Sequence, residues 1–237
     1  MPAIKAKNTV KSGTTQSRHA AASGRKGRPL TRIQREKQDA ILEAALDVFS
    51  AHGFRGATID QIAEQAGMSK PNLLYYFPRK DAIYKRLITG MLEIWLAPLR
   101  EMRDDGDPIP EIRSYLRRKL EMARDFPRES RLFANEILQG APRIHDILEG
   151  ELKTLVEEKA AILYGWMDEG KITRTDPYHL IFSIWATTQH YADFDVQVRA
   201  VLGTERGGEG RFEDAARYLE NLFLNGLLPK KPATSSS

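Results

Sequence analysis

The pattern of hydrophobic and polar positions predicts a chain made of helices. From residue 31 onward, large hydrophobic residues recur three or four positions apart, which is the spacing of one helix face. No segment alternates strictly between apolar and polar residues over the length of a strand, and no Asn-Gly or Asp-Gly turn lies between alternating runs. We therefore predict an all-α fold in two parts.

Three helices are predicted over residues 31–79, of which the second and third are short. Gly53 stands where the first helix needs a left-handed residue at its end. Thr58 and Gln61 form the sequence of a capping box at the start of the second helix, and Ser69 is the expected cap of the third. Helices of this length are marginal on their own in water, so we expect the second and third to pack against the first.

Longer helices are predicted after Lys80. They cover residues 80–103, 110–126, 128–139, 142–169, 177–201 and 212–227. Segments rich in Gly, Pro and Asp separate most of them, and Asp176 followed by Pro177 is a typical helix start. We expect these helices to form a second domain over residues 80–228, followed by a flexible tail over residues 229–237.

Charge is distributed unevenly along the chain. Residues 1–37 contain ten Lys or Arg and one acidic residue, whereas the rest of the chain has 26 basic and 31 acidic residues. A basic arm beside an acidic body favours a polyanionic partner at one end, and a solubilising tail is the alternative. Residues 1–30 have few large hydrophobic side chains, so we expect a disordered basic arm there.

Composition excludes several classes of protein. The chain has no Cys, which excludes disulfide frameworks and thiolate metal sites. Its longest apolar stretch, residues 180–186, is far shorter than the roughly 18 residues that a membrane span needs, so we expect a cytoplasmic protein without a membrane partner. The common catalytic motifs are absent, so we expect no enzyme activity, no catalytic residue, no metal and no cofactor.

The segment Gly67-Met-Ser69 joins the second and third helices in the manner of a helix-turn-helix, whose second helix enters the DNA major groove. Further motif residues around it are Phe49, Gly53-Phe54, Thr58, Tyr75-Tyr-Phe-Pro78 and Lys80-Asp81. Together they resemble the DNA-binding domain of the TetR family of bacterial repressors. The resemblance implies a helix-turn-helix domain over residues 31–79, and a helical domain that binds a ligand and dimerises. The resulting homodimer would read a palindromic DNA operator with two recognition helices about 34 Å apart.

Candidate DNA contacts divide into phosphate contacts and base contacts. They are Arg55, Thr58, Ser69, Lys70, Asn72, Tyr75, Tyr76 and Lys80. Helix N-termini attract anions, so Thr58 and Ser69 are expected at phosphates, and the positive charges of Arg55 and Lys80 suit the same role. Lys70, Asn72 and Tyr75 are candidates for base edges. Two alternatives stay open: Arg55 is a solvated loop charge, or one ring of the tyrosine pair packs inside.

One predicted helix places a polar amide among apolar side chains. Gln189 shares a face of the 177–201 segment with Ile181 and Trp185. A buried amide without a partner costs about 1–3 kcal/mol, so Gln189 needs a backbone carbonyl, a water or a ligand. His190 and Asp193 have the spacing of a possible metal pair, but two ligands are too few to predict a site.

Runs in both domains, among them residues 72–78, 94–99 and 188–194, resemble the pyrimidine-utilisation repressors of the TetR family. The resemblance implies release from operator DNA by uracil or thymine, in the control of pyrimidine degradation and related nitrogen metabolism. Another small aromatic effector or a drug is the alternative. Candidate ligand contacts are Trp95, Phe133, Trp185, Gln189, His190 and Asp193. An amide suits the edge of a flat pyrimidine and an indole suits its face, and we expect coupling to DNA through the helix that joins Lys80 to Trp95.

Overall fold

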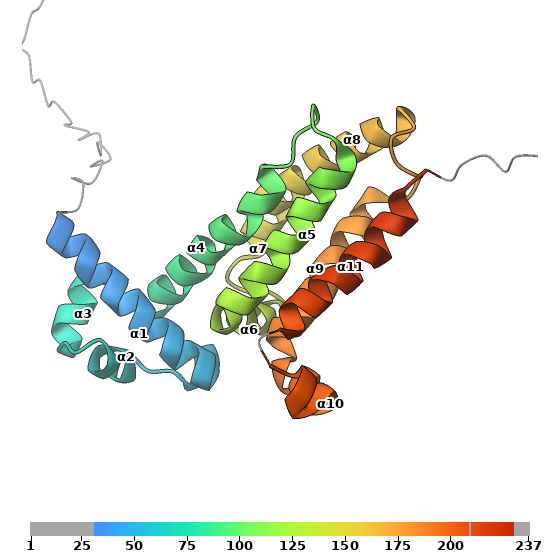
Figure 1. Ribbon diagram of the computed structural model, residues 1–237. Coiled ribbons are helices and arrows are strands. Elements are labelled where there is room, and N and C mark those ends of the chain that lie inside the picture. Colours follow the sequence, from blue (N-terminus) through green and yellow to red (C-terminus); the bar gives the residue numbers. More distant parts are fainter. Residues whose placement is uncertain (1–30, 209, 230–237) are drawn as a thin grey trace, which may run out of the picture.

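The computed structural model describes residues 31–208 and 210–229 (Figure 1). The predicted arm over residues 1–30 and most of the predicted tail lie outside these ranges. The described helices are α1 (Arg32–Gly56), α2 (Ile59–Gln65), α3 (Lys70–Tyr76), α4 (Lys80–Arg100), α5 (Pro108–Asp125), α6 (Pro127–Leu138), α7 (His145–Ile147), the π-helical turn η1 (Leu148–Leu152), α8 (Lys153–Asp168), α9 (Pro177–Asp193), α10 (Asp195–Arg206) and α11 (Arg211–Leu227). Neither described range contains a strand, and the all-α prediction is confirmed.

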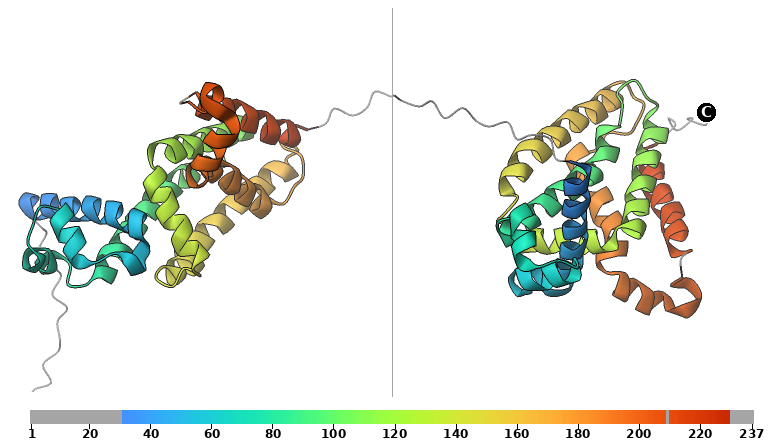
Figure 2. Two further views of the ribbon diagram at one scale, coloured as in Figure 1. Left: turned by 90° about the horizontal axis from the view of Figure 1, so that it is seen from below. Right: turned by 90° about the vertical axis from the view of Figure 1, so that its left-hand side faces the viewer.

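The molecule is elongated, with α1–α3 at one end (Figures 1 and 2). α4 leads from this end into the larger helical body, where α5 packs against α9 and α11. α6 packs against both α1 and α9, so it joins the two ends of the molecule. Among the helices described, none is long and apolar enough to cross a membrane.

Local side-chain bonds fix the starts of the short helices. The capping box predicted at α2 is present: the Gln61 backbone N–H donates to the Thr58 hydroxyl at 3.2 Å, and the Thr58 backbone N–H donates to the side-chain Oε1 of Gln61 at 2.9 Å. Gly67 has φ +63°, which only glycine adopts without strain in the tight turn before α3. Asp176 caps α9 as predicted, accepting from the His179 N–H at 3.0 Å.

Two of the predicted long helices are wrong in extent. The 177–201 segment is two helices, because Phe194 has φ −114° and ψ 27° and ends α9. The Asp195 carboxylate then accepts from Arg211 at 2.8 Å, which ties the start of α10 to the start of α11. The 142–169 segment is also interrupted: Ile144 has φ −130°, and a short helix and a π-helical turn precede α8.

Two main groups of buried hydrophobic residues form the core. One lies inside the larger helical body, among α4, α5, α8, α9 and α11. The other holds α1–α3 together and includes Ile62, Leu73 and Phe77, but it continues into α4 and reaches Leu132 of α6. The short helices are therefore stabilised by α4 and α6 as well as by one another. A movement of α4 or α6 would therefore also shift side chains that pack beneath α2 and α3.

Candidate functional site

The helix-turn-helix presents α3 as an exposed helix. Side chains along its outer side are exposed, including Lys70, Asn72 and Tyr75, whose exposed fraction is 72%. On its inner side, Leu73 is completely buried in the core beneath α1 and α2. The sequence produces this arrangement because hydrophobic and polar residues of α3 fall on opposite sides of two helical turns. Asn72 and Tyr75 are thus exposed on one helix, and their contact with base edges stays a prediction.

The phosphate candidates at the helix starts differ in how free their hydroxyls are. The Thr58 hydroxyl accepts from the Gln61 backbone and donates to the Gln61 side chain at 2.9 Å. The Ser69 hydroxyl caps α3 by position but makes no capping hydrogen bond. Ser69 therefore has its hydroxyl available to a phosphate. Lys70, by contrast, forms an ion pair with Asp60 of α2 at 2.9 Å, between two exposed side chains.

The two tyrosines divide their roles. Tyr76 is half-buried against the core, and its ring meets the exposed Tyr75 ring edge to face at 5.1 Å.

Lys80 is also half-buried and donates to the carbonyls of Phe54 and Ala57, both at 2.7 Å. Lys80 is therefore a brace that binds the end of α1, and its contact with a DNA phosphate stays a prediction. Its ammonium also lies 4.5 Å from the centre of the Phe54 ring.

Arg55 lies away from α3, near the end of α1. It is exposed, and it lines a surface hollow together with His52, Gln139 and Arg143. The last two residues belong to the region that follows α6 along the chain. The arrangement places Arg55 where α1 faces the larger body, which is consistent with the alternative that it is a solvated charge.

Four of the six predicted ligand contacts surround one small cavity in the larger helical body. Trp95, Phe133, Trp185 and Gln189 come from three helices, and the Trp95 and Phe133 rings meet edge to face at 5.4 Å. The cavity has a volume of about 50 Å³. A water needs roughly 10–15 Å³ by this measure, so the space suits a few waters or one small ring.

Lys119 of α5 lines the same cavity and was not predicted from the sequence. It is buried, and its ammonium lies 5.3 Å from the centre of the Trp95 ring. Burial lowers the pKa of Lys119 to about 8, while the Asp193 carboxylate opposes that shift. A signal was present in the sequence: Lys119 follows Ile112, Tyr115 and Leu116 on the apolar face of its helix.

Two polar groups in the cavity wall have unused hydrogen-bonding capacity. Among the described residues, neither the Lys119 ammonium nor the Gln189 amide makes a hydrogen bond, although the fully buried side-chain atoms without a hydrogen-bond partner are two others, Arg211 Nε and Glu220 Oε1. The other polar groups nearby are already paired. The Trp185 indole N–H donates to the buried Tyr115 hydroxyl, and the Ser130 hydroxyl donates to Asp193. The cavity thus offers an ammonium donor and an amide edge between aromatic rings.

The remaining two predicted contacts stand outside the cavity wall. His190 is exposed and stacks on Phe194 with ring centres 5.0 Å apart. Asp193 is half-buried behind Lys119, and burial raises its pKa above the usual range, against the lowering effect of the Ser130 hydrogen bond. Asp193 therefore contacts Ser130 and influences the Lys119 ammonium from outside the cavity wall, whereas His190 is exposed to solvent.

Comparison with known proteins identifies the class to which this fold and these two sites belong. Residues 41–87 match the family of bacterial regulatory proteins named after TetR, and residues 88–230 match the C-terminal region of YcdC-like proteins. The chain belongs to the TetR family. It is a helix-turn-helix transcriptional regulator rather than an enzyme, and regulators of this family bind operator DNA and act as dimers.

Among individual relatives, the transcriptional regulator RutR of Escherichia coli K12 is 50% identical over 194 residues, covering 82% of this chain and 92% of RutR. RutR of Shigella flexneri has the same identity and coverage. Of solved structures, the ketosteroid regulator KstR2 of Mycobacterium tuberculosis has a TM-score of 0.65 and 20% identity, over 82% of this chain and 96% of that one. That similarity concerns the fold alone.

Proposed function

We propose that this regulator represses genes of pyrimidine degradation and related nitrogen metabolism, and that uracil or thymine releases it from its operator. The observation that carries the proposal is the pair of unsatisfied polar groups, Lys119 and Gln189, in a small aromatic cavity. The 50% identity to RutR supports it, because the resemblance to that protein implies a pyrimidine effector.

The donors and acceptors of the cavity match those of uracil. Uracil alternates C=O and N–H groups around one flat ring. The Gln189 amide can donate to a carbonyl and accept from the neighbouring N–H, while the Lys119 ammonium donates to a second carbonyl. Trp95, Phe133 and Trp185 supply aromatic surface to the ring. Cytosine has an amino group in place of one carbonyl, so it presents a donor where the site requires an acceptor.

Effector binding can reach the DNA-binding end through two helices. α4 carries Trp95 at the cavity and Lys80 at the brace to α1. α6 carries Phe133 at the cavity, and its Arg128 pairs with Glu43 of α1 at 2.8 Å. An effector shifts DNA affinity only by binding one arrangement of these helices more tightly than the other. We infer that the pyrimidine favours an arrangement in which the two α3 helices of the dimer no longer match one operator.

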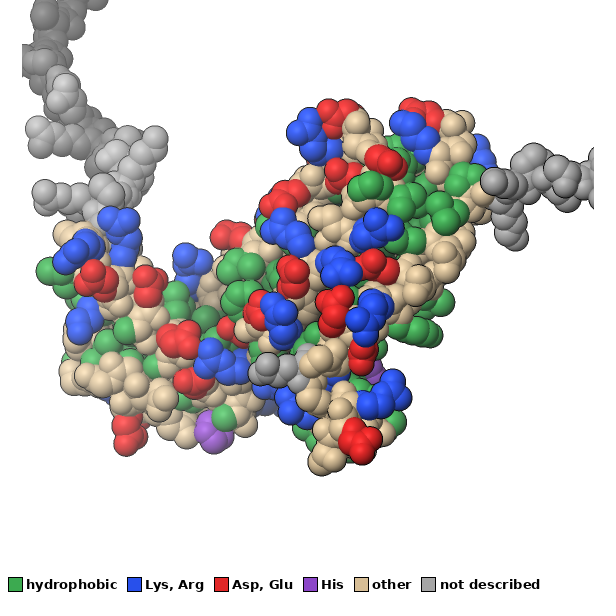
Figure 3. All heavy atoms as spheres, viewed as in Figure 1, with side chains coloured by type: hydrophobic (Ala, Val, Ile, Leu, Met, Phe, Trp, Pro, Cys, Tyr) green, Lys and Arg blue, Asp and Glu red, His purple; other side chains and the backbone are tan. Residues whose placement is uncertain are grey.

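The dimer surface is proposed on the last helices of the chain. Some apolar residues of these helices belong to the core, including Ile181, Ile184 and Leu219. Phe182 of α9 and Tyr218 and Leu222 of α11 are exposed instead, at 47%, 62% and 52%. Figure 3 shows hydrophobic side chains gathered beside α11, on the side away from α1. Exposed apolar patches of this kind mark association surfaces.

The experiment that tests the function combines calorimetry with operator binding. We expect wild-type protein to bind one uracil per chain, with thymine also bound and cytosine excluded. Uridine should be excluded as well, because its ribose exceeds the space in the cavity. Operator DNA selected in vitro from a random pool should be released on addition of uracil. Binding of cytosine as tightly as uracil would contradict the donor and acceptor assignment.

A single substitution then assigns the response to the cavity. Gln189→Leu should abolish release by uracil and leave operator binding intact, since the change removes only the amide. Gln197→Leu is a matched control, because Gln197 is exposed on α10. A Gln189→Leu protein that still leaves the operator when uracil is added would overturn the Gln189 assignment.

A further inference from the structure

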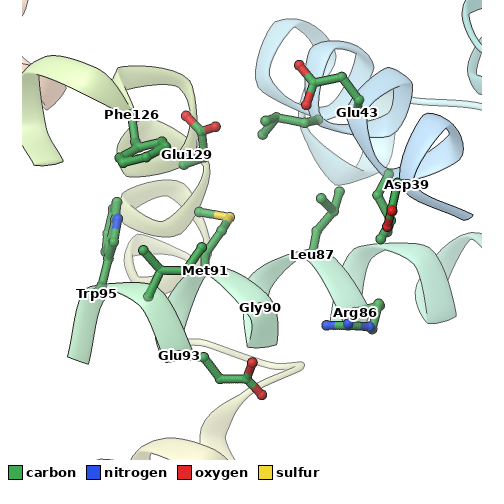
Figure 4. Close-up of a pocket in the computed structure, with 13 residues that line it drawn as sticks. Asp39, Glu43, Arg86, Leu87, Gly90, Met91, Glu93, Trp95, Phe126 and Glu129 are labelled. Atoms are coloured by element: carbon green, nitrogen blue, oxygen red, sulfur yellow. The ribbon is translucent and has the colours of Figure 1, made fainter. Parts of the chain in front are cut away.

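A second and larger hollow opens between the DNA-binding end and the body of the molecule. It has a volume of about 390 Å³ and lies between α1, α4 and the start of α6 (Figure 4). Its surface is mainly apolar, and Leu87 and Met91 project from α4 toward α1 in Figure 4. The other large apolar residues in its wall are Leu42, Leu46, Ile94 and Phe126. A volume of this order suits a drug-sized molecule.

The rim of this groove is acidic. Asp39 and Glu43 of α1, Glu93 of α4 and Glu129 of α6 all line it, against the single basic residue Arg86. Only Glu43 among the four has an ion pair with another described residue, to Arg128. In Figure 4, Asp39 and Glu43 stand on α1 above the groove, and Glu129 stands near Phe126.

An acidic rim attracts a cation, and aromatic rings at one end of the groove add to this attraction. Trp95 and Phe126 lie at one end of the groove, facing one another in Figure 4. A positive charge close to the face of such a ring is attracted by its quadrupole, by about 0.5–2 kcal/mol. Trp95 also forms part of the wall of the smaller cavity. The groove and the pyrimidine cavity are therefore neighbours with one shared side chain.

We propose that this groove is a second ligand site, for a drug-sized lipophilic cation. The apolar walls take the body of the molecule, and the carboxylates of Asp39, Glu93 and Glu129, which are spread along the groove, attract its positive charge. A neutral molecule of the same shape forgoes the charge interaction, and an anion is repelled by the rim. The site is separate from the pyrimidine cavity, which uses Lys119 and Gln189 and contains no acidic residue in its wall.

The probe for the test is tetraphenylphosphonium, with tetraphenylborate as an anion of the same shape. Calorimetry on the full-length protein should show one tetraphenylphosphonium bound per chain, with an affinity at least about tenfold above that of tetraphenylborate. Absence of cation binding, or equal binding of the anion, would overturn the proposal. If the cation binds only after deletion of residues 1–30, the occupant of the groove is that basic segment, and the proposal is overturned.

Two variants locate the binding in the groove. Gly90→Leu fills the groove from α4, where the glycine is helical and an added Cβ would lie 3.2 Å from the end of the flexible Arg86 side chain. The triple variant Asp39→Asn, Glu93→Gln, Glu129→Gln keeps the shape and removes the charge. Each variant should lower the affinity for the cation by about tenfold or more and leave the affinity for uracil unchanged. Unchanged cation affinity in the folded variants would place the binding elsewhere.

The control for the triple variant removes the same charge at distant exposed positions, with Glu157→Gln, Glu169→Gln and Glu205→Gln. It should bind the cation as wild type does. Thermal melting shows whether each variant is folded. If Gly90→Leu is unfolded, the triple variant alone tests whether the cation binds in the groove. Uracil titration of wild type is scored separately, so failure of the pyrimidine proposal and failure of the groove proposal give different results.

Discussion

The two ends of the molecule hold their functional groups in opposite ways. On α3, Asn72 and Tyr75 are exposed to solvent on two helical turns. In the cavity, Lys119 and Gln189 come from α5 and α9 and lie among aromatic rings without a hydrogen-bond partner in the described chain. The exposed groups cost little stability in the absence of their ligand. The Lys119 side chain is buried and the Gln189 side chain is half-buried, so both are costly without a partner, and a ligand that satisfies them recovers that free energy.

This difference predicts separable effects of substitution. A change on the exposed side of α3 should alter DNA binding alone, because no core contact is lost. A change of a polar group in the cavity should alter ligand affinity and stability together, in opposite directions. The following experiments test that contrast, beginning with the largest expected effect.

Lys119→Met should weaken uracil binding and raise stability. The methionine fills the lysine volume without a charge, and loss of a charged hydrogen bond lowers affinity by about tenfold to a hundredfold. A pKa held near 8 rather than 10.5 corresponds to roughly 3 kcal/mol of cost at neutral pH, so the melting temperature should rise. Calorimetry and thermal melting measure the two effects.

The matched control is Lys153→Met, at an exposed lysine of α8 that forms only a surface pair with Glu157. It should change neither uracil affinity nor melting temperature appreciably, since exposed pairs contribute about 0–1 kcal/mol. A Lys119→Met protein that melts below wild type would show that the ammonium stabilises the fold. In that case the contrast between the two ends would fail.

The tyrosine pair tests the other side of the contrast. Tyr75→Ala should lower operator affinity by about tenfold or more through loss of one base contact, with melting temperature and uracil affinity unchanged. Tyr76→Ala should lower the melting temperature, because that ring is half-buried against the core of α1–α3. Anisotropy with labelled operator and thermal melting separate them. Equal destabilisation by both substitutions would mean that Tyr75 is a packing residue.

The pH dependence of uracil affinity should follow the protonation of the Lys119 ammonium. A pKa of about 8 leaves the ammonium mostly charged at pH 7 and mostly neutral at pH 9, so uracil affinity should fall by up to about tenfold across that interval. Repeating the titration with Lys119→Met supplies the control, in which the residual affinity no longer changes with pH. A flat wild-type profile would contradict the role of the ammonium.

Stability should change with pH in the opposite sense. The folded pKa of Lys119 is lowered from 10.5, so between pH 8 and 10.5 the unfolded chain binds more protons than the folded one. The free energy of unfolding contributed by Lys119 therefore increases as pH rises through that window. Buried tyrosines such as Tyr115 titrate above it, since burial raises their pKa. The difference between wild type and Lys119→Met isolates the lysine.

The same contrast explains how far the sequence could predict each site. The helix-turn-helix is local: its caps, its Gly67 turn and its exposed residues lie within about twenty positions, where spacing and capping chemistry apply directly. The cavity brings together side chains from α4, α5, α6 and α9. Gln189 could be predicted from the sequence because it is a polar residue on an apolar helix face. Lys119 carries the same signal, but a lysine at such a position usually extends its charge to solvent.

Other details depended on tertiary contacts that spacing does not contain. The binding of Lys80 to the end of α1 requires the carbonyls of Phe54 and Ala57, which the chain brings close only when α1 and α4 pack. The break at Phe194 precedes an ordinary run of helix-forming residues, and α10 is held by the Asp195–Arg211 pair across 16 positions. Neither contact follows from helix propensity or periodicity.

The smallest effect is expected at the ion pair between α2 and α3. Asp60→Asn removes the carboxylate that holds Lys70 at 2.9 Å, but both side chains are about half exposed or more, so stability should change by less than about 0.5 kcal/mol. Operator affinity should rise by up to about threefold, because a negative charge beside the phosphates is lost and the Lys70 ammonium is freed. Anisotropy at two salt concentrations measures this gain. A loss of operator affinity would instead mean that Asp60 orients Lys70 for base reading, in which case even an exposed group of α3 depends on a contact within the protein.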